Sequence, residues 1–267
     1  MITWVLNASI NSVVTPDLRK LWGLCRSAKC PLCGHHQASL FHILVGCRVA
    51  LQQLRYSWRH DSVLVTAEQL LRHRVEQHNA SPCKEEQRSI KFRSANKPRP
   101  KSSTRDPPKK HSYSSVLGSG SASDWKIQID YTKRPVPFPV HICVTNQRPD
   151  IVLYSDSLRM VILIELTCPA EENITDANLR KEIKYTPLKK QITDNNWACH
   201  LWPIEVGARG FVAGSVSRCL RRLGFSNSGN KALMRRMSRS ASRCSFYIYR
   251  SLRVPTWKWT SLVEIVE

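Results

Sequence analysis

The chain has 267 residues, with 41 Lys and Arg against 20 Asp and Glu, which gives a formal net charge of +21. This length allows one large or two small domains with hydrophobic cores, and the charge indicates a polyanionic partner such as nucleic acid or an anionic membrane surface. No run of about 18 apolar residues exists to span a bilayer, and the opening residues have no basic lead typical of a signal peptide. We therefore expect an intracellular protein whose ten cysteines are metal ligands, core residues or free thiols and do not form disulfides.

The first motif has the spacing of a zinc site. Cys30 and Cys33 are followed by His42 and Cys47, a C-x2-C-x8-H-x4-C arrangement with apolar residues around the histidine. Two thiolates from one turn, joined by a histidine and a third thiolate, suit tetrahedral Zn²⁺. The alternative is a set of buried thiols with a core histidine, and the competing ligands are Cys25, His35 and His36.

The segment that follows mixes cations with aromatic and apolar residues. Apolar positions between residues 49 and 71 predict one or two amphipathic helices. Arg55 and Arg59, next to Trp58 and His60, are candidates for contacts with nucleic-acid phosphates and bases. A solvated helix face is the alternative.

Composition divides the chain into three parts. Residues 1–75 form the predicted zinc-binding module, and residues 76–123 a basic linker with few large apolar side chains, expected to be disordered. Residues 124–267 form the second domain. Alternation of apolar and polar residues predicts strands at residues 125–131, 140–144, 151–154, 161–166 and 197–206, and hence a mixed sheet of about four or five strands flanked by helices, an α/β fold.

Two carboxylates stand at the ends of neighbouring predicted strands. Asp150 precedes one strand, and Glu165 ends the next, which is apolar on both faces and therefore central. An ionised carboxylate in a dry sheet needs a cation, donors or access to water. If the strands are antiparallel neighbours, Asp150 and Glu165 can bind one Mg²⁺, with the Leu166 carbonyl as a third ligand.

The next segment supplies basic residues on a helix. Lys181, Tyr185, Leu188 and Ile192 recur at i, i+4, i+7 and i+11, which places them on one helical face towards the sheet. Pro187 either kinks this helix or begins a second one. Glu205, near the end of the predicted strand at residues 197–206, is a possible extra acid but is expected to be a surface or rim residue.

Two further helices close the chain. Apolar stripes at residues 212–223 and 233–248 predict helices that pack on the core, with arginines mostly on their other faces. Arg218 and Arg222 are candidates for contacts with a duplex backbone, although charge on a helix face is also compatible with simple solvation.

The motifs from Arg148 to Tyr185, in their order and spacing, resemble a known family. Pro149-Asp150, Glu165-Leu166-Thr167 and the KxxxY pattern Lys181 to Tyr185 resemble the restriction-like PD-(D/E)xK endonuclease domain of site-specific non-LTR retrotransposons, which also has a preceding CCHC motif. The usual lysine of the second motif is replaced by Thr167. The resemblance covers roughly the last half of the chain.

The resemblance implies a Mg²⁺-dependent endonuclease that nicks target DNA. Asp150 and Glu165 would hold Mg²⁺, and Lys181, with Lys184 in reserve, would offset charge on the phosphate. Tyr185 would donate to a phosphate or fix the lysine, Thr167 would bond a metal-bound water, and Arg148 would neutralise a neighbouring phosphate.

The resemblance also implies a nuclear protein with DNA as partner, RNA as a second candidate, and a reverse transcriptase on a separate chain. The rival hypothesis is a catalytically inactive nucleic-acid-binding remnant with a structural zinc. A third is a zinc-dependent scaffold that binds another protein.

Overall fold

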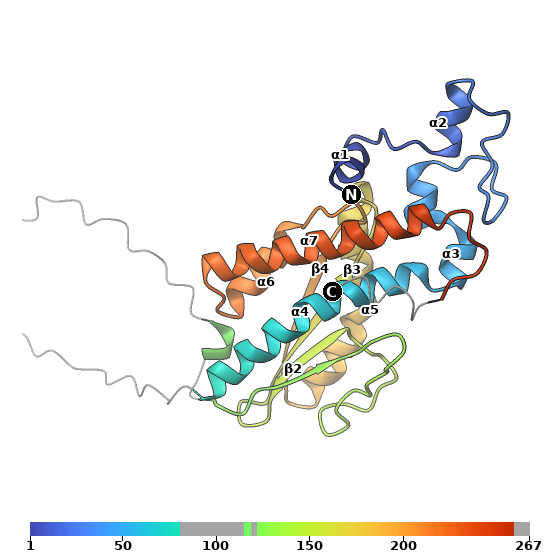
Figure 1. The fold of residues 1–267 in the computed structure, drawn as a ribbon. Helices are drawn as coiled ribbons and strands as arrows, with labels where there is room; N and C mark the ends of the chain where they lie inside the picture. Colours follow the sequence, from blue (N-terminus) through green and yellow to red (C-terminus); the bar gives the residue numbers. More distant parts are fainter. Residues whose placement is uncertain (81–114, 119–121, 259–267) are drawn as a thin grey trace, which may run out of the picture.

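A computed structural model describes residues 1–80, 115–118 and 122–258 (Figure 1). Most of the predicted linker lies outside the described residues. The described chain contains a four-stranded sheet, helices on both of its faces, and a small helical segment at the amino terminus. The predicted α/β class, a mixed sheet flanked by helices, is confirmed.

The sheet has the order β1-β2-β3-β4. Its strands are β1 (Lys126–Ile129), β2 (Ile151–Ser155), β3 (Met160–Thr167) and β4 (Ala198–Glu205). The first three are antiparallel, and β3 and β4 are parallel, joined by the crossover helix α5 (Ile174–Asp194). Only the connection from β3 to β4 is a crossover, so the sheet combines antiparallel and parallel strands.

The face of the sheet opposite α5 carries the larger core. Here α4 (Arg55–Ala80), α6 (Gly214–Arg222) and α7 (Asn227–Arg250) pack on alternate residues of the strands. The predicted division at residue 75 thus falls within one helix, and the apolar residues of that helix belong to the same core as the sheet. Figure 1 shows α4 and α7 running side by side along the body.

The other face of the sheet packs against α5 and the loop at residues 132–147. Tyr185, Leu188 and Ile192 are buried there together with Leu163 of β3, which confirms the predicted helical face. Pro187 does not end α5, which runs from Ile174 to Asp194 with the exposed proline inside it. The helix continues past Pro187 without a second helix beginning there, and its buried face continues from Tyr185 to Leu188 and Ile192.

One predicted strand is wrong. Residues 140–142 form a turn and residues 143–144 are irregular, with Val140 and Val144 exposed and the consecutive residues Ile142 and Cys143 buried. Pro135, Pro137 and Pro139 precede them, and each proline lacks the amide that a sheet ladder requires. The alternating pattern therefore anchors a loop through Ile142 and does not add a strand.

Short elements make up the amino-terminal segment, and two short turns lie elsewhere in the chain. The elements of the segment are α1 (Ile2–Ser9), α2 (Pro16–Leu21), a π-helical turn η1 (His42–Gly46) and α3 (Arg48–Gln52). The short 3-10 turns are η2 (Val116–Gly118) and η3 (Glu171–Asn173). The chain enters α4 from α3, so the predicted zinc motif is joined directly to the helix that covers the sheet.

Candidate functional site

The four predicted zinc ligands come together. The ligand atoms of Cys30, Cys33, His42 and Cys47 all lie within 4.8 Å of one another, and Cys33 Sγ is 3.3 Å from His42 Nε2. A Cys3His set of this size can hold one tetrahedral metal ion and is consistent with structural zinc. Within residues 1–80, 115–118 and 122–258, this is the only group of three or more His, Cys, Asp or Glu side chains that brings its ligand atoms this close together.

Local backbone structure presents these ligands. The Cys30 amide donates to the His35 carbonyl and the Gly34 amide to the Cys30 carbonyl, a tight turn in which Gly34 takes φ +75°. Glycine adopts this angle without the steric strain of a side chain. The turn aims Cys30 and Cys33 at η1, which carries His42 and leads into Cys47.

Burial of the cluster disfavours a thiolate that no cation compensates. Burial raises the pKa of the Cys47 thiol to about 11, and a buried thiolate is stabilised by a metal. Tyr56 Oη accepts from the Cys47 amide (3.0 Å) and donates to the Ile43 carbonyl (3.0 Å), which fixes the backbone behind the ligands.

The competing residues lie outside this group. The ring of His35 stacks on His42 at 4.5 Å, and Cys25 Sγ contacts the Pro16 carbonyl at 3.8 Å.

Asp150 and Glu165 meet at the end of the sheet. They occupy facing positions just beyond the pair Ile151 and Ile164 of β2 and β3. The Asp150 amide donates to Glu165 Oε2 (3.1 Å), and the Leu166 amide donates to Asp150 Oδ2 (2.7 Å). Two carboxylates separated by fifteen positions are thus held together through backbone amides.

Glu165 is buried and faces α5. Its side chain is 2% exposed, and Lys181 Nζ donates to Oε1, while Lys184 Nζ is 3.9 Å from the same oxygen. Burial raises the pKa of Glu165, and the neighbouring Asp150 carboxylate raises it further, against the opposing effect of Lys181. Lys181 is therefore the closer of the two candidate lysines.

Tyr185 and Lys184 form the next contacts outward. Lys184 Nζ donates to Tyr185 Oη (2.9 Å), and Tyr185 Oη donates to the Arg148 carbonyl (3.1 Å). Arg148 is exposed, and its Nε lies 3.8 Å from Asp130 Oδ2. Thr167 Oγ1 is buried and has no hydrogen-bond partner among the described residues.

Asp150 contacts a residue from the opposite helical layer. His60 of α4 places Nε2 at 3.2 Å from Asp150 Oδ2 and at 3.2 Å from the Leu166 carbonyl. Burial opposes the charged imidazole, yet the Asp150 carboxylate and the hydrogen bonds to Asp150 and Asp61 raise the pKa of His60 well above its usual value. Asp150 and Glu165 are thus held by cations from opposite faces of the sheet.

Sequence reasoning missed this role of His60, which it grouped with surface cations. A usable signal existed: His60, Leu64, Ala67 and Leu71 recur at i, i+4, i+7 and i+11, so the histidine lies in line with the buried stripe of α4. Glu205 was also placed wrongly. It is 2% exposed at the end of β4 and accepts from Asn178 (2.7 Å) and Ser215 (2.5 Å).

Besides Arg148, four arginines are predicted to bind nucleic acid, and they divide into two pairs. Arg55 and Arg59 are 0% and 1% exposed, and their guanidinium groups donate to buried or part-buried oxygens of other segments. In this position they present no surface to a phosphate. Arg218 and Arg222 are exposed on α6, and Arg222 stacks over Trp202 at 5.4 Å.

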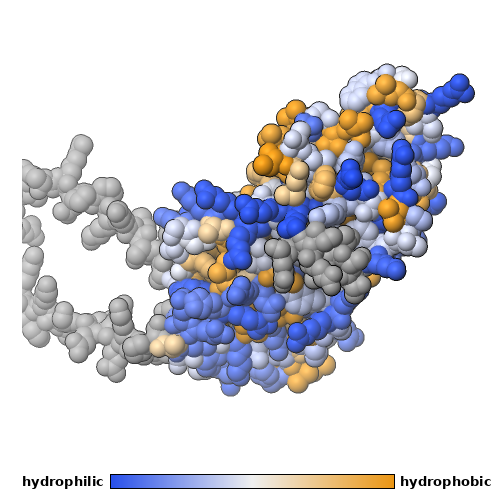
Figure 2. Space-filling model, in the orientation of Figure 1, coloured by the Kyte–Doolittle hydropathy of each residue, from blue (hydrophilic) through white to orange (hydrophobic). Residues whose placement is uncertain are grey.

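The surface has distinct polar and apolar regions. Figure 2 shows hydrophilic side chains over much of the body, whereas hydrophobic ones gather near the amino-terminal helices. The exposed apolar side chains of this segment include Ile2, Leu6, Ile10, Leu21 and Trp22. Large exposed apolar patches mark interaction sites. These side chains are therefore the feature that would fit a scaffold that binds another protein.

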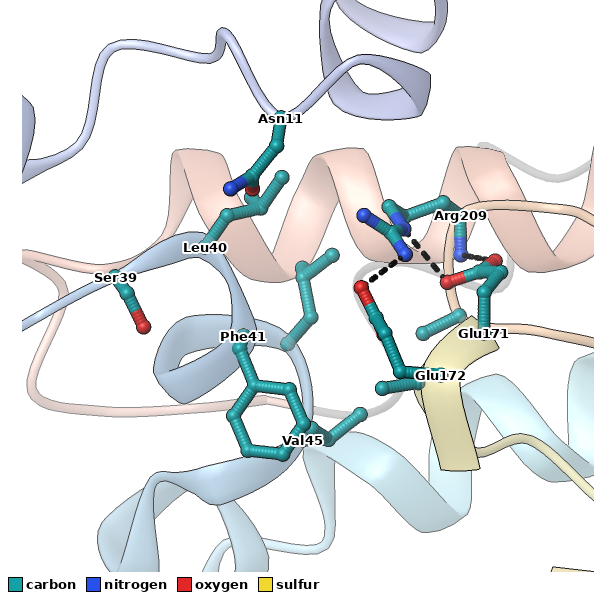
Figure 3. A pocket seen from close by; sticks show the side chains of 11 residues that line it. Asn11, Ser39, Leu40, Phe41, Val45, Glu171, Glu172 and Arg209 are labelled. Carbon is teal, nitrogen blue, oxygen red and sulfur yellow. Dashed lines mark hydrogen bonds and ion pairs between the residues drawn. The ribbon is translucent and has the colours of Figure 1, made fainter. Parts of the chain in front are cut away.

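A small pocket lies where the amino-terminal segment meets the sheet. Its volume is about 180 Å³, and Phe41 and Val45 of that segment line one side (Figure 3). Arg209 closes the other side by ion pairs to Glu171 (2.7 Å) and Glu172 (2.6 Å). Because these charges are paired with one another, the pocket contributes no free acid or base to the Asp150 site.

Comparisons with known proteins add no assignment. No family model matches the chain, and no curated protein matches it. The described part of the chain also has no helix long and apolar enough to cross a bilayer.

Proposed function

We propose that this protein is a metal-dependent DNA endonuclease with a structural zinc. The observation that carries the proposal is the meeting of Asp150 and Glu165 at the end of β3, with Lys181 in contact with Glu165. A carboxylate pair, a backbone carbonyl and a helix-borne lysine, in a chain of net charge +21, form a donor set suited to phosphodiester hydrolysis. The mixed sheet and the preceding Cys3His cluster agree with the resemblance in the sequence.

Each residue has a proposed task. Asp150, Glu165 and the Leu166 carbonyl would hold a divalent ion, which when bound polarises the scissile phosphate and lowers the pKa of a water molecule. Lys181 offsets negative charge at the phosphate. Thr167 Oγ1, lacking a protein partner among the described residues, is free to bond a water.

The outer residues guide the substrate. Tyr185 and Lys184 fix the Arg148 backbone, and the exposed Arg148 side chain contacts the adjoining phosphate. Arg218 and Arg222 provide further phosphate contacts from α6. We expect the protein to act on DNA in the nucleus, next to a reverse transcriptase on a separate chain, with RNA as an alternative ligand.

A second candidate is an inactive nucleic-acid-binding module. It is favoured by the cations that already neutralise both acids, His60 at Asp150 and Lys181 at Glu165. In that case the network is an internal ion-pair cluster that closes the end of the sheet, and the exposed arginines alone bind the polyanion.

Plasmid nicking separates the two candidates. The zinc-loaded wild type is incubated with supercoiled plasmid and Mg²⁺ or Mn²⁺, and with EDTA as the metal-free reference. The endonuclease hypothesis expects metal-dependent nicking that Glu165→Gln reduces at least 100-fold, while DNA affinity measured by fluorescence anisotropy changes less than 3-fold.

The chain offers a matched control. Glu205 is equally buried on the adjacent strand, so Glu205→Gln tests the effect of losing a buried carboxylate without touching the site. It should nick like the wild type. Absence of metal-dependent nicking by folded wild type would reject the endonuclease and leave the binding module. Full activity of Glu165→Gln would remove Glu165 from the mechanism.

A further inference from the structure

The donor set around Asp150 includes an imidazole nitrogen. His60 Nε2 lies 3.2 Å from Asp150 Oδ2 and 3.2 Å from the Leu166 carbonyl oxygen. The site is enclosed, since the side chains of His60 and Asp150 are 23% and 14% exposed. Asp150 and Leu166 contribute hard oxygens that suit Mg²⁺, whereas a histidine nitrogen between them does not belong to an ordinary Mg²⁺ shell.

These distances equal those between neighbouring ligands of one ion. In an octahedral shell with metal–ligand bonds of about 2.1 Å, adjacent ligands at right angles are about 3.0 Å apart. The nitrogen therefore already lies at nearly this spacing from each of the two oxygens.

The other ring nitrogen of His60 is oriented for this role. Nδ1 lies 3.1 Å from Asp61 Oδ1. Asp61 is 8% exposed and is fixed by the Thr132 amide (3.0 Å) and the Thr132 hydroxyl (3.2 Å). Metal-binding histidines commonly donate their second N–H to a carboxylate, which sets the tautomer and leaves the first nitrogen free for the metal.

We propose that His60 is a metal ligand beside Asp150 and the Leu166 carbonyl, and that it makes this site select Mn²⁺ and related transition ions over Mg²⁺. The proposal rests on the proposed function for the location of the ion. Asp61 is then a positioning residue, which holds the imidazole with Nε2 directed at the ion. Glu165, which Lys181 contacts, remains the second carboxylate of the proposed site.

The test uses the full chain with one equivalent of zinc already bound, so that Mn²⁺ does not enter the Cys3His cluster. Electron spin echo measurements on bound Mn²⁺ should show coupling to a ¹⁴N nucleus. Calorimetry should give an affinity for Mn²⁺ at least 10-fold above that for Mg²⁺. No nitrogen coupling in the wild type, or equal affinities, would overturn the proposal, and this readout requires no variant.

Two variants locate the nitrogen. His60→Phe retains an aromatic ring but no ligand, and should lose the ¹⁴N coupling and at least 10-fold in Mn²⁺ affinity, with Mg²⁺ affinity changed less than 3-fold. The control is His141→Phe, because His141 also pairs with an aspartate, Asp156 (2.9 Å), but at the surface. It should behave as wild type. Coupling that survives in His60→Phe would reduce His60 to an ion-pair partner of Asp150.

Failure of this inference is distinguishable from failure of the proposed function. Nicking with Mg²⁺ and Mn²⁺ alike, without nitrogen coupling, would preserve the endonuclease and reject the His60 ligand. Nitrogen-coupled Mn²⁺ without any nicking would preserve the metal site and reject the endonuclease.

Discussion

The buried residue Arg59 joins the segment that carries the Cys3His cluster to the end of β3. Nη1 donates to the Leu44 carbonyl and to Ser245 Oγ, both at 3.0 Å, and Nη2 donates to the Cys168 carbonyl at 3.1 Å. The substitution Arg59→Met keeps most of the aliphatic side chain and removes all three hydrogen bonds. Ser245 Oγ still donates to the Ala208 carbonyl, so two carbonyls lose a partner. An unsatisfied buried group costs about 1–3 kcal/mol, and we expect a loss of about 3 kcal/mol in the free energy of unfolding.

Urea unfolding of the zinc-loaded protein, followed by tryptophan fluorescence, measures this loss. With a slope of about 2 kcal/mol per molar urea, the midpoint should fall by about 1.5 M. Arg222→Met is the control, since Arg222 is exposed and only stacks over Trp202; it should cost less than about 1 kcal/mol. If Arg59→Met unfolds at the same urea concentration as Arg222→Met, the three buried hydrogen bonds do not hold the two parts together.

Three further predictions concern the metal, the lysine and pH. Cys33→Ser should lose zinc, measured by atomic absorption, and expose the amino-terminal segment to limited proteolysis, because a structural zinc supplies on the order of 10 kcal/mol; retained zinc would exclude Cys33 as a ligand. Lys181→Met should lower plasmid nicking about 100-fold and Lys184→Met less than 10-fold, since only Lys181 contacts Glu165 directly; equal losses would contradict this. Although burial works the other way, hydrogen bonds from two serine hydroxyls and an amide lower the pKa of Asp124 from 3.8 to about 2. Its stabilising effect is present above pH 3.8 and lost as pH falls towards 2, so acid should lower the urea midpoint less steeply in Asp124→Asn than in the wild type.

The spacing of apolar residues correctly predicted the strands and helices whose buried faces follow from their own sequence. The apolar run of β3 is buried on both faces, and Tyr185, Leu188 and Ile192 line one face of α5, as their spacing indicates. Alternation at residues 140–144 failed, because the prolines before it, and not the side-chain pattern, decide whether a ladder can form. For Pro187 the sequence left two outcomes open, a kink or a second helix, and the structure shows one helix that continues through it.

Contacts between residues far apart in the sequence could not be predicted from the periodicity of apolar residues. The Asp150 and Glu165 pair was predictable because a short connection joins their antiparallel strands. The approach of His60 to Asp150 spans 90 positions, and that of Arg59 to the Cys168 carbonyl spans 109. Both depend on how α4 packs across the sheet, which composition and periodicity do not fix.

The consecutive residues Arg59 and His60 give α4 two tasks at once. Arg59 reaches the Leu44 carbonyl, which lies between the ligands His42 and Cys47, and His60 reaches Asp150. Arg59 and His60 are consecutive residues of one helix. A displacement of α4 at Arg59 should therefore also move the ring of His60. Unfolding of the segment that carries the Cys3His cluster would withdraw the Leu44 carbonyl and leave a buried guanidinium partly unsatisfied, which favours such a displacement. We therefore expect the segment that carries the Cys3His cluster to support the Asp150 site structurally, because consecutive residues of α4 contact both.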